Sequence, residues 1–153
     1  MPLPTPDTPL SGACRCGALR MEITAPPFMT AACHCTGCQR MASSAFSLTM
    51  MVAADAFRVT EGTPVTAGAG SPDLTHYACP ECHSWVYTQM TGFDFVNLRS
   101  ALFDDPTWTR PFIETQRAEA LPWVPELAPH GFDRFPEMES FPELMAAFAA
   151  ERL

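Results

Sequence analysis

The seven cysteines of this chain constrain its fold more than any other feature of the sequence. They form three clusters: Cys14 with Cys16, then Cys33 with Cys35 and Cys38, then Cys79 with Cys82. In an extended chain, residues two positions apart point to the same face, so a C-x-C pair can bind one ion from one side. A C-x-x-C turn directs two sulfurs toward one point, which is typical of zinc sites. An odd number of cysteines fits a disulfide scaffold poorly.

The ligand numbers that zinc prefers indicate how these cysteines divide. Zinc takes four protein ligands at structural sites and three at sites that keep an open position. We therefore expect the four to be Cys14, Cys16, Cys79 and Cys82, and the three to be Cys33, Cys35 and Cys38. The other division adds Cys79 and Cys82 to the middle cluster. It would give that cluster five ligands and leave the first pair alone, so we favour it less.

Composition and charge narrow the function classes. The chain has 153 residues, of which 47% are hydrophobic and 17% charged, which predicts a single globular domain. A net charge of −8 argues against nucleic acid or an anionic membrane as the main partner. The sequence contains no lysine, which excludes a Schiff-base lysine and a phosphate-binding P-loop lysine.

The sequence also indicates a compartment. The longest strictly apolar run, Leu144–Ala150, is far shorter than the roughly 20 residues that cross a bilayer. The N-terminus has neither the basic start nor the apolar core of an export signal. We therefore expect a cytoplasmic protein, and in that reducing compartment clustered cysteines favour metal binding over disulfides.

Hydrophobic alternation predicts a mainly β fold. Over residues 18–24, Leu19, Met21 and Ile23 fall on one face, which indicates a half-buried strand. Further strands are expected over residues 45–52, 57–60, 74–78, 85–90, 93–98 and 112–116. The strands over 74–78 and 85–90 flank the third cysteine cluster and should form a hairpin.

The C-terminal end has a helical pattern instead. Phe141, Leu144, Met145 and Phe148 follow the i, i+3, i+4, i+7 spacing, with Ser140 as a candidate cap, and predict an amphipathic helix. We expect a flexible proline-rich arm over residues 1–10, one domain over 11–124, and an extension carrying the helix over 125–153. The extension could cover the domain or form a contact surface specific to this chain.

Three motifs together resemble the glutathione-dependent formaldehyde-activating enzyme family, which also includes centromere protein V. They are the segments at 11–20 and 33–40 and the pair Cys79 and Cys82, and the likeness spans roughly residues 11–123. The resemblance implies a zinc-bearing β-tent of stacked antiparallel sheets. It implies a structural zinc on Cys14, Cys16, Cys79 and Cys82, and a second, functional zinc on Cys33, Cys35 and Cys38.

The resemblance implies a reaction as well, the joining of glutathione and formaldehyde to S-(hydroxymethyl)glutathione by a carbon–sulfur lyase. A zinc on Cys33, Cys35 and Cys38 could hold an incoming thiol as its nucleophilic thiolate. Because glutathione is anionic, we take Arg40 as the first candidate for a carboxylate clamp, a solvated surface arginine being the alternative. The alternative function is a non-catalytic zinc module that contacts a protein or small thiol, its middle zinc closed by a fourth ligand.

The chain departs from the family pattern in two places. His83 follows the third cysteine cluster where the family usually has glycine, and histidine tolerates positive φ better than most residues. Phe112-Ile113 stands where many members carry a His-Ile pair. His34 lies between two expected ligands, and alternation points it away from their zinc.

Overall fold

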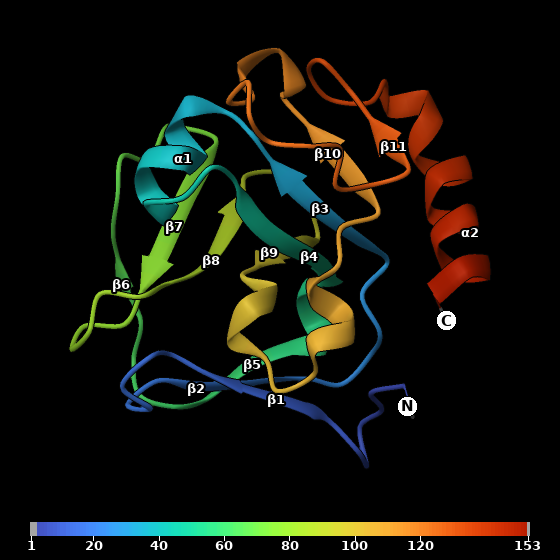
Figure 1. The fold of residues 1–153 in the computed structure, drawn as a ribbon. Coiled ribbons are helices and arrows are strands. Elements are labelled where there is room, and N and C mark those ends of the chain that lie inside the picture. Colours follow the sequence, from blue (N-terminus) through green and yellow to red (C-terminus); the bar gives the residue numbers. More distant parts are fainter. Residues whose placement is uncertain (1–2, 153) are drawn as a thin grey trace.

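The protein consists of two stacked β-sheets with a helix at either end (Figure 1). A computed structural model describes residues 3–152. The strands are β1 (Leu10–Ala13), β2 (Arg20–Ile23), β3 (Met29–Cys33), β4 (Ser47–Ala53), β5 (Phe57–Glu61), β6 (Val65–Thr66), β7 (Leu74–Ala78), β8 (Trp85–Met90), β9 (Phe95–Leu98), β10 (Ile113–Thr115) and β11 (His130–Gly131). The α-helices are α1 (Thr36–Ala42) and α2 (Phe141–Arg152). In the described part of the chain, no helix is long and apolar enough to cross a membrane.

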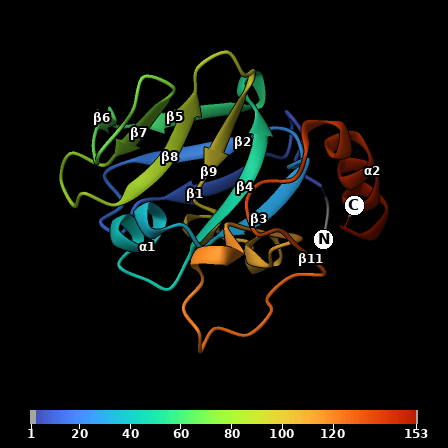
Figure 2. The same ribbon diagram turned by 90° about the horizontal axis from the view of Figure 1, so that it is seen from above.

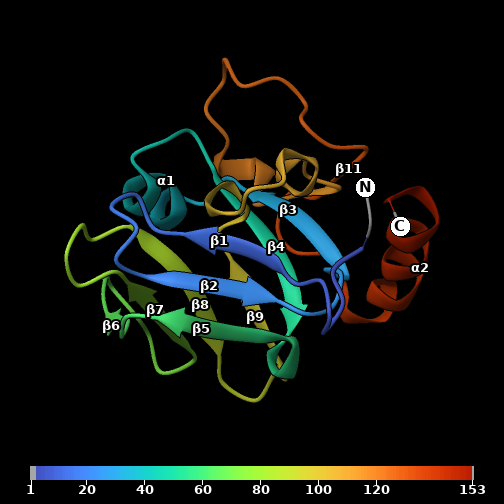
Figure 3. The same ribbon diagram turned by 90° about the horizontal axis from the view of Figure 1, so that it is seen from below.

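The smaller sheet lies across one face of the larger one (Figure 3). It has the order β1-β2-β5 and is antiparallel. The larger sheet has the order β11-β10-β3-β4-β9-β8-β7-β6. Its pairs are antiparallel except for β10, which runs parallel to both β3 and β11. The predicted mainly β fold of stacked sheets with a C-terminal helix is confirmed, with these two parallel pairs as the departure.

The core fills the space between the sheets. Leu19, Met21 and Ile23, predicted to share one face, are at most 1% exposed, and they pack in one cluster with Met50 and Val52 of β4. Each such side chain contributes roughly 1.5–3 kcal/mol when it is fully buried. The period-two pattern of the sequence therefore identified the face of the small sheet that contacts the large sheet.

All seven expected strands are present, and two of them, β7 and β8, have the expected bounds. Strands β7 and β8 form the predicted hairpin around the third cysteine cluster. Strand β3 was not expected, because it lies between β10 and β4 and is buried on both faces, so its sequence Met-Thr-Ala-Ala-Cys does not alternate. Strands β1, β6 and β11 and helix α1 were not expected either. None of the residues of α1 is buried, so its sequence has no apolar stripe.

Helix α2 lies at the opposite end of the molecule from α1 (Figure 2). It buries Leu144 and Phe148, as the spacing predicts, and it starts where Ser140 ends a short 3-10 turn. The prediction for Met145 is wrong, because that side chain is 37% exposed. Phe141 is half-buried, so the helix contacts the domain mainly through Leu144 and Phe148.

Helix α2 packs against the side chain of Phe112. Phe112 is 1% exposed, and its ring meets that of Phe148 edge-on with centroids 5.5 Å apart. The ring of His130, which begins β11, lies 4.7 Å away on the same phenylalanine. A phenylalanine at position 112 thus gives the C-terminal segment an apolar surface to pack on.

Residues 1–2 of the expected arm and Leu153 of the expected extension lie outside the described residues. Strand β1 starts at Leu10, and the flexibility of the arm stays a prediction.

Truncating the anchor of α2 tests this packing. We expect Phe148→Ala to lower the free energy of unfolding by about 3–5 kcal/mol, because it leaves a cavity against Phe112. Met145→Ala, on the exposed side of the same helix, should change it by less than about 0.5 kcal/mol. Urea denaturation of both variants measures the difference. Equal effects of the two substitutions would show that the packing of Phe148 on Phe112 does not stabilise the protein.

Candidate metal centre

The first group of sulfurs joins two turns that are distant in sequence. Cys14 and Cys16 lie in the turn after β1, and Cys79 and Cys82 lie in the turn of the β7–β8 hairpin. Their four sulfurs lie within 4.8 Å of one another. The Cys14–Cys16 and Cys16–Cys79 sulfur distances are 3.5 and 3.8 Å. A tetrahedral zinc with Zn–S bonds of 2.3 Å places its sulfurs about 3.8 Å apart, so this group fits a metal ion of that kind.

Backbone hydrogen bonds shape the hairpin turn around its two cysteines. Cys79 N–H donates to the Ser84 carbonyl and His83 N–H donates to the Cys79 carbonyl, each at 3.0 Å. His83 has φ of +57°, the left-handed conformation that glycine would adopt most easily. The turn therefore tolerates histidine, as expected. Hydrogen bonds from Ser84 lower the pKa of Cys82 to about 5, which favours the thiolate that a metal requires.

The second group of sulfurs lies on one short loop. Cys33 ends β3, Cys35 is the N-cap of α1, and Cys38 is in the first turn of that helix. The Cys35 sulfur accepts a hydrogen bond from the Cys38 N–H at 3.3 Å, which bends the chain into the helix. The three sulfurs lie within 4.8 Å of one another. Within residues 3–152, no histidine, carboxylate or further cysteine joins this group, whereas the other group has four members.

The pKa values of the three thiols are shifted in different directions. A hydrogen bond from Cys38 lowers the pKa of Cys33 to about 5, although burial opposes that shift. The same hydrogen bond to Cys33 raises the pKa of Cys38, and burial raises the pKa of Cys35. The group therefore carries a thiolate at Cys33 at neutral pH. Such a group fits a cation that replaces the two remaining protons.

A loop from the second half of the chain holds the start of α1. Glu119 Oε2 accepts hydrogen bonds from both the N–H and the hydroxyl of Thr36, each at 2.7 Å. Gln39 donates its side-chain amide to the carbonyls of His34 and Glu119, at 2.6 and 3.0 Å. A carboxylate at a helix N-terminus is also favoured by the helix dipole. These contacts fix the loop that carries the three sulfurs.

His34 belongs to a buried pair behind this loop. Its ring is fully buried, and its Nε2 lies 2.9 Å from the Oε1 of Glu114, which is 1% exposed. As expected, the imidazole is not among the grouped metal ligands. The other oxygen of Glu114 accepts the N–H groups of Leu127 and Ala128, at 3.0 and 3.1 Å. One carboxylate therefore links the sulfur loop to the C-terminal segment.

Arg99 is a residue of the site that sequence reasoning missed. It follows β9 directly, and its side chain is only 9% exposed. The guanidinium lies over the Trp85 ring at 4.0 Å and donates to the Asn97 carbonyl at 3.1 Å. Burial lowers its pKa to about 10, while the neighbouring Cys38 and Cys33 sulfurs oppose the shift, so Arg99 stays charged at neutral pH. The sequence alone does not relate it to the sulfurs, because it is 61 positions from Cys38. The relation comes from the sheet, in which β9 pairs with β4 and β4 pairs with β3, the strand that ends at Cys33.

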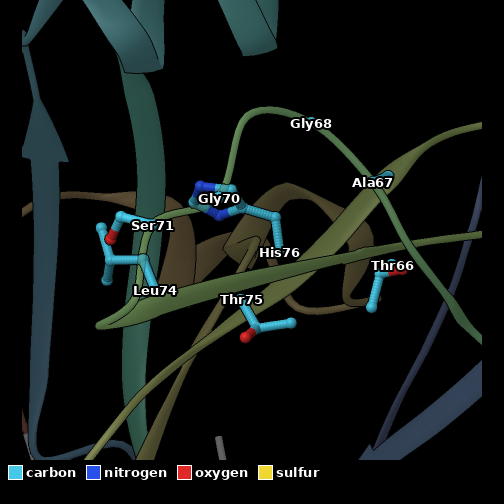
Figure 4. Close-up of a pocket in the computed structure, with 8 residues that line it drawn as sticks. All are labelled: Thr66, Ala67, Gly68, Gly70, Ser71, Leu74, Thr75 and His76. Carbon is cyan, nitrogen blue, oxygen red and sulfur yellow. The ribbon is translucent and has the colours of Figure 1, made fainter.

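A groove borders the helix of the second sulfur group. Its volume is about 320 Å³, and it is lined by Thr66, Ala67, Gly68, Gly70, Ser71, Leu74, Thr75 and His76. The His76 side chain rises from β7 toward the loop of Gly68 and Gly70 (Figure 4). A Cβ at Gly68 would lie 2.7 Å from the Cε of Met41, so this loop packs on α1. Arg40, the predicted clamp, is exposed on α1 beside Met41.

Comparisons with known proteins agree with this geometry. Residues 9–117 match the family described as glutathione-dependent formaldehyde-activating enzyme. The chain belongs to this family. The match is close to the expected span and contains all seven cysteines of the two sulfur groups.

Solved structures support the fold. The crystal structure of a Rhodobacter sphaeroides protein is similar, with a TM-score of 0.52 and 18% sequence identity. The alignment covers 63% of this chain and 92% of that one. None of the curated proteins matches. The family match ends before β11 and α2, so the segment that packs on Phe112 lies beyond it.

The unequal thiol pKa values predict a pH profile. With the three-cysteine group free of metal, Cys33 should react with iodoacetamide at a nearly constant rate from pH 8 downward. The rate should fall only as the pH drops through about 5, because the lowered pKa keeps the thiolate above that value. Cys38, whose pKa is raised, should stay unlabelled over the same range. Peptide mapping by mass spectrometry measures both. A Cys33 rate that rises between pH 8 and 9 would contradict the assignment.

Proposed function

We propose that this protein is a zinc-dependent enzyme of the carbon–sulfur lyase class, which adds a small thiol to a small aldehyde. Glutathione and formaldehyde, giving S-(hydroxymethyl)glutathione, are the first substrates to test. The observation that carries the proposal is the group of Cys33, Cys35 and Cys38, which offers three ligands where the other group offers four. Family membership supports the substrates, and grouped cysteines of this kind support zinc and a reducing cytoplasm.

The residues of the loop fit that chemistry. All three sulfurs are half-buried, so they can face a small ligand without being enclosed by the chain. Zinc bound here would supply a Lewis-acidic fourth position that favours the thiolate form of an incoming thiol. In the reaction, the sulfur attacks the carbonyl carbon, the π electrons move to oxygen, and the thiol proton ends on that oxygen. The reverse reaction breaks the same carbon–sulfur bond.

The rest of the chain keeps the loop in place during this reaction. Thr36 and Gln39 are hydrogen-bonded to Glu119, and His34 to Glu114, so the fold itself supports the loop that carries the three sulfurs. Preorganised ligands need little rearrangement to bind a metal or a substrate. The four-cysteine group lies on other turns and supports the fold instead, which is the role of a structural zinc.

Replacing one ligand tests the proposal. We expect Cys35→Ser to lower the catalysed rate of S-(hydroxymethyl)glutathione formation by about 100-fold or more, since it removes one zinc ligand. Serine is a good N-cap, so α1 should keep its start, and the protein should retain the zinc of the four-cysteine group. Exchange spectroscopy by NMR gives the rate above the uncatalysed background, and elemental analysis gives the zinc content.

Two results would contradict the proposal. One is a wild-type protein that holds two zinc ions but does not accelerate the reaction, which would favour a non-catalytic zinc module. The other is an unchanged rate in Cys35→Ser with the three-cysteine zinc lost. Ser44→Ala, an exposed hydroxyl next to the end of α1, is the matched control and should retain full activity.

Arg40 is the proposed carboxylate clamp for glutathione. It is exposed on the last turn of α1, so its ion pair with a substrate carboxylate would be worth about 1 kcal/mol. We expect Arg40→Ala to raise the KM for glutathione about three- to fivefold and to leave kcat unchanged. The KM for 2-mercaptoethanol, which has no carboxylate, should not change. If both thiols respond equally, or neither does, Arg40 is a surface arginine and not a clamp.

A further inference from the structure

Arg99 is a buried cation, and the sulfurs of Cys33 and Cys38 are the opposite charges that act on it. Its side chain is 9% exposed, and no hydrogen-bond partner for its Nε is found among residues 3–152. Within the same residues, none of the ion pairs includes Arg99. A buried charge costs several kcal/mol unless an opposite charge lies close to it. Strand pairing brings Arg99 toward these sulfurs: Leu98, the residue before it, pairs with Met50 of β4, and β4 pairs through Ser47 with Cys33 of β3. The charges of Cys38 and Cys33 accordingly raise the pKa of this guanidinium against the effect of burial.

Trp85 and its neighbours fix the position of that cation. The guanidinium stacks on the Trp85 ring, whose Nε1 donates to the Thr88 hydroxyl at 3.2 Å. The same hydroxyl lies 2.8 Å from Nδ1 of His76, and the His76 ring meets Trp85 edge-on at 5.3 Å. Burial and the Arg99 charge lower the pKa of His76, so this layer adds no second positive charge at neutral pH. Of the four side chains described here, Arg99 is thus the one that carries a positive charge, and the Trp85 ring and the Asn97 carbonyl fix its position.

We propose that Arg99 is a positioning residue that compensates the charge of the three-cysteine site and so favours an anionic fourth ligand over a neutral one. Three thiolates and one zinc ion leave a single negative charge, and a bound thiolate would add another. With Arg99 alongside, the site starts neutral and takes the thiolate at a smaller electrostatic cost. The inference rests on the proposed function, because it assumes a metal with an open position on Cys33, Cys35 and Cys38.

The test uses the full chain loaded with Co²⁺, whose visible spectrum reports a new ligand. The probes are 2-mercaptoethanol, which binds as a thiolate, and imidazole, which binds as a neutral ligand, both at pH 8. We expect Arg99→Gln to weaken mercaptoethanol binding at least tenfold and imidazole binding less than threefold. Arg99→Lys, which keeps the charge, should stay within threefold of wild type for both probes. Arg58→Gln, which removes an exposed arginine paired with Glu22, is the control for net charge.

The outcomes separate this inference from the proposed function. If Arg99→Gln weakens both probes equally, or neither, Arg99 does not select the charge of the ligand and the inference is wrong. If the wild type binds neither probe, the open position is absent and the proposed function fails. In that case the retention of Zn²⁺ against a chelator tests the role of Arg99. Charge compensation predicts that the three-cysteine group of Arg99→Gln retains Zn²⁺ at least tenfold more weakly than that of the wild type. Equal retention would overturn the inference.

Separate controls establish that each variant is folded. Thermal unfolding of each variant is measured first, and the four-cysteine group serves as an internal reference, since it should retain its Zn²⁺ in every variant. If Arg99→Gln does not fold, Arg99→Met is measured in its place, because it fills the same buried volume without a polar group. Arg99→Lys separates charge from shape in either case.

Discussion

The contact between four sulfurs is the interaction on which the rest of the structure depends. Cys16 and Cys79 are 63 positions apart, and their sulfurs lie 3.8 Å from each other. One belongs to the turn that joins β1 and β2 of the small sheet, and the other to the β7–β8 turn of the large sheet. A shared metal would therefore hold the two sheets together at the end where these turns meet. It would also remove the entropy of the long loop from the unfolded chain.

The three-sulfur loop depends on a different kind of support. Its contacts are hydrogen bonds to segments about 80 positions later in the chain, from Thr36 and Gln39 to Glu119 and from His34 to Glu114. Glu114 in turn binds the segment at 127–128 through its second oxygen. The second half of the chain thus acts as a brace for a loop that has little core of its own. A functional site on a loop needs such a brace, because α1 buries none of its residues.

The sequence predicted those features that leave a local pattern. Alternation at Leu19, Met21 and Ile23 marked the core face of β2, and cysteine spacing marked both sulfur groups. Strand β3 and helix α1 left no such pattern, one being buried on both faces and the other on none. Arg99 could not be found in this way, since a single arginine after a strand is usually a surface residue. Its role follows from burial and from neighbours that only the fold brings together.

The charge of the whole protein and the charge at the site work in opposite directions. A net charge of −8 repels an anionic thiol at a distance, but salt screens that repulsion beyond about 8 Å at physiological ionic strength. A buried guanidinium such as that of Arg99 is screened far less, so it contributes to the potential of the sulfur group more strongly than an exposed charge would. The acidic surface therefore argues against nucleic acid as the preferred partner and still permits an anionic small molecule. What a site of this kind accepts depends on the few charges that the fold places within it, and those charges are set by packing and not by composition.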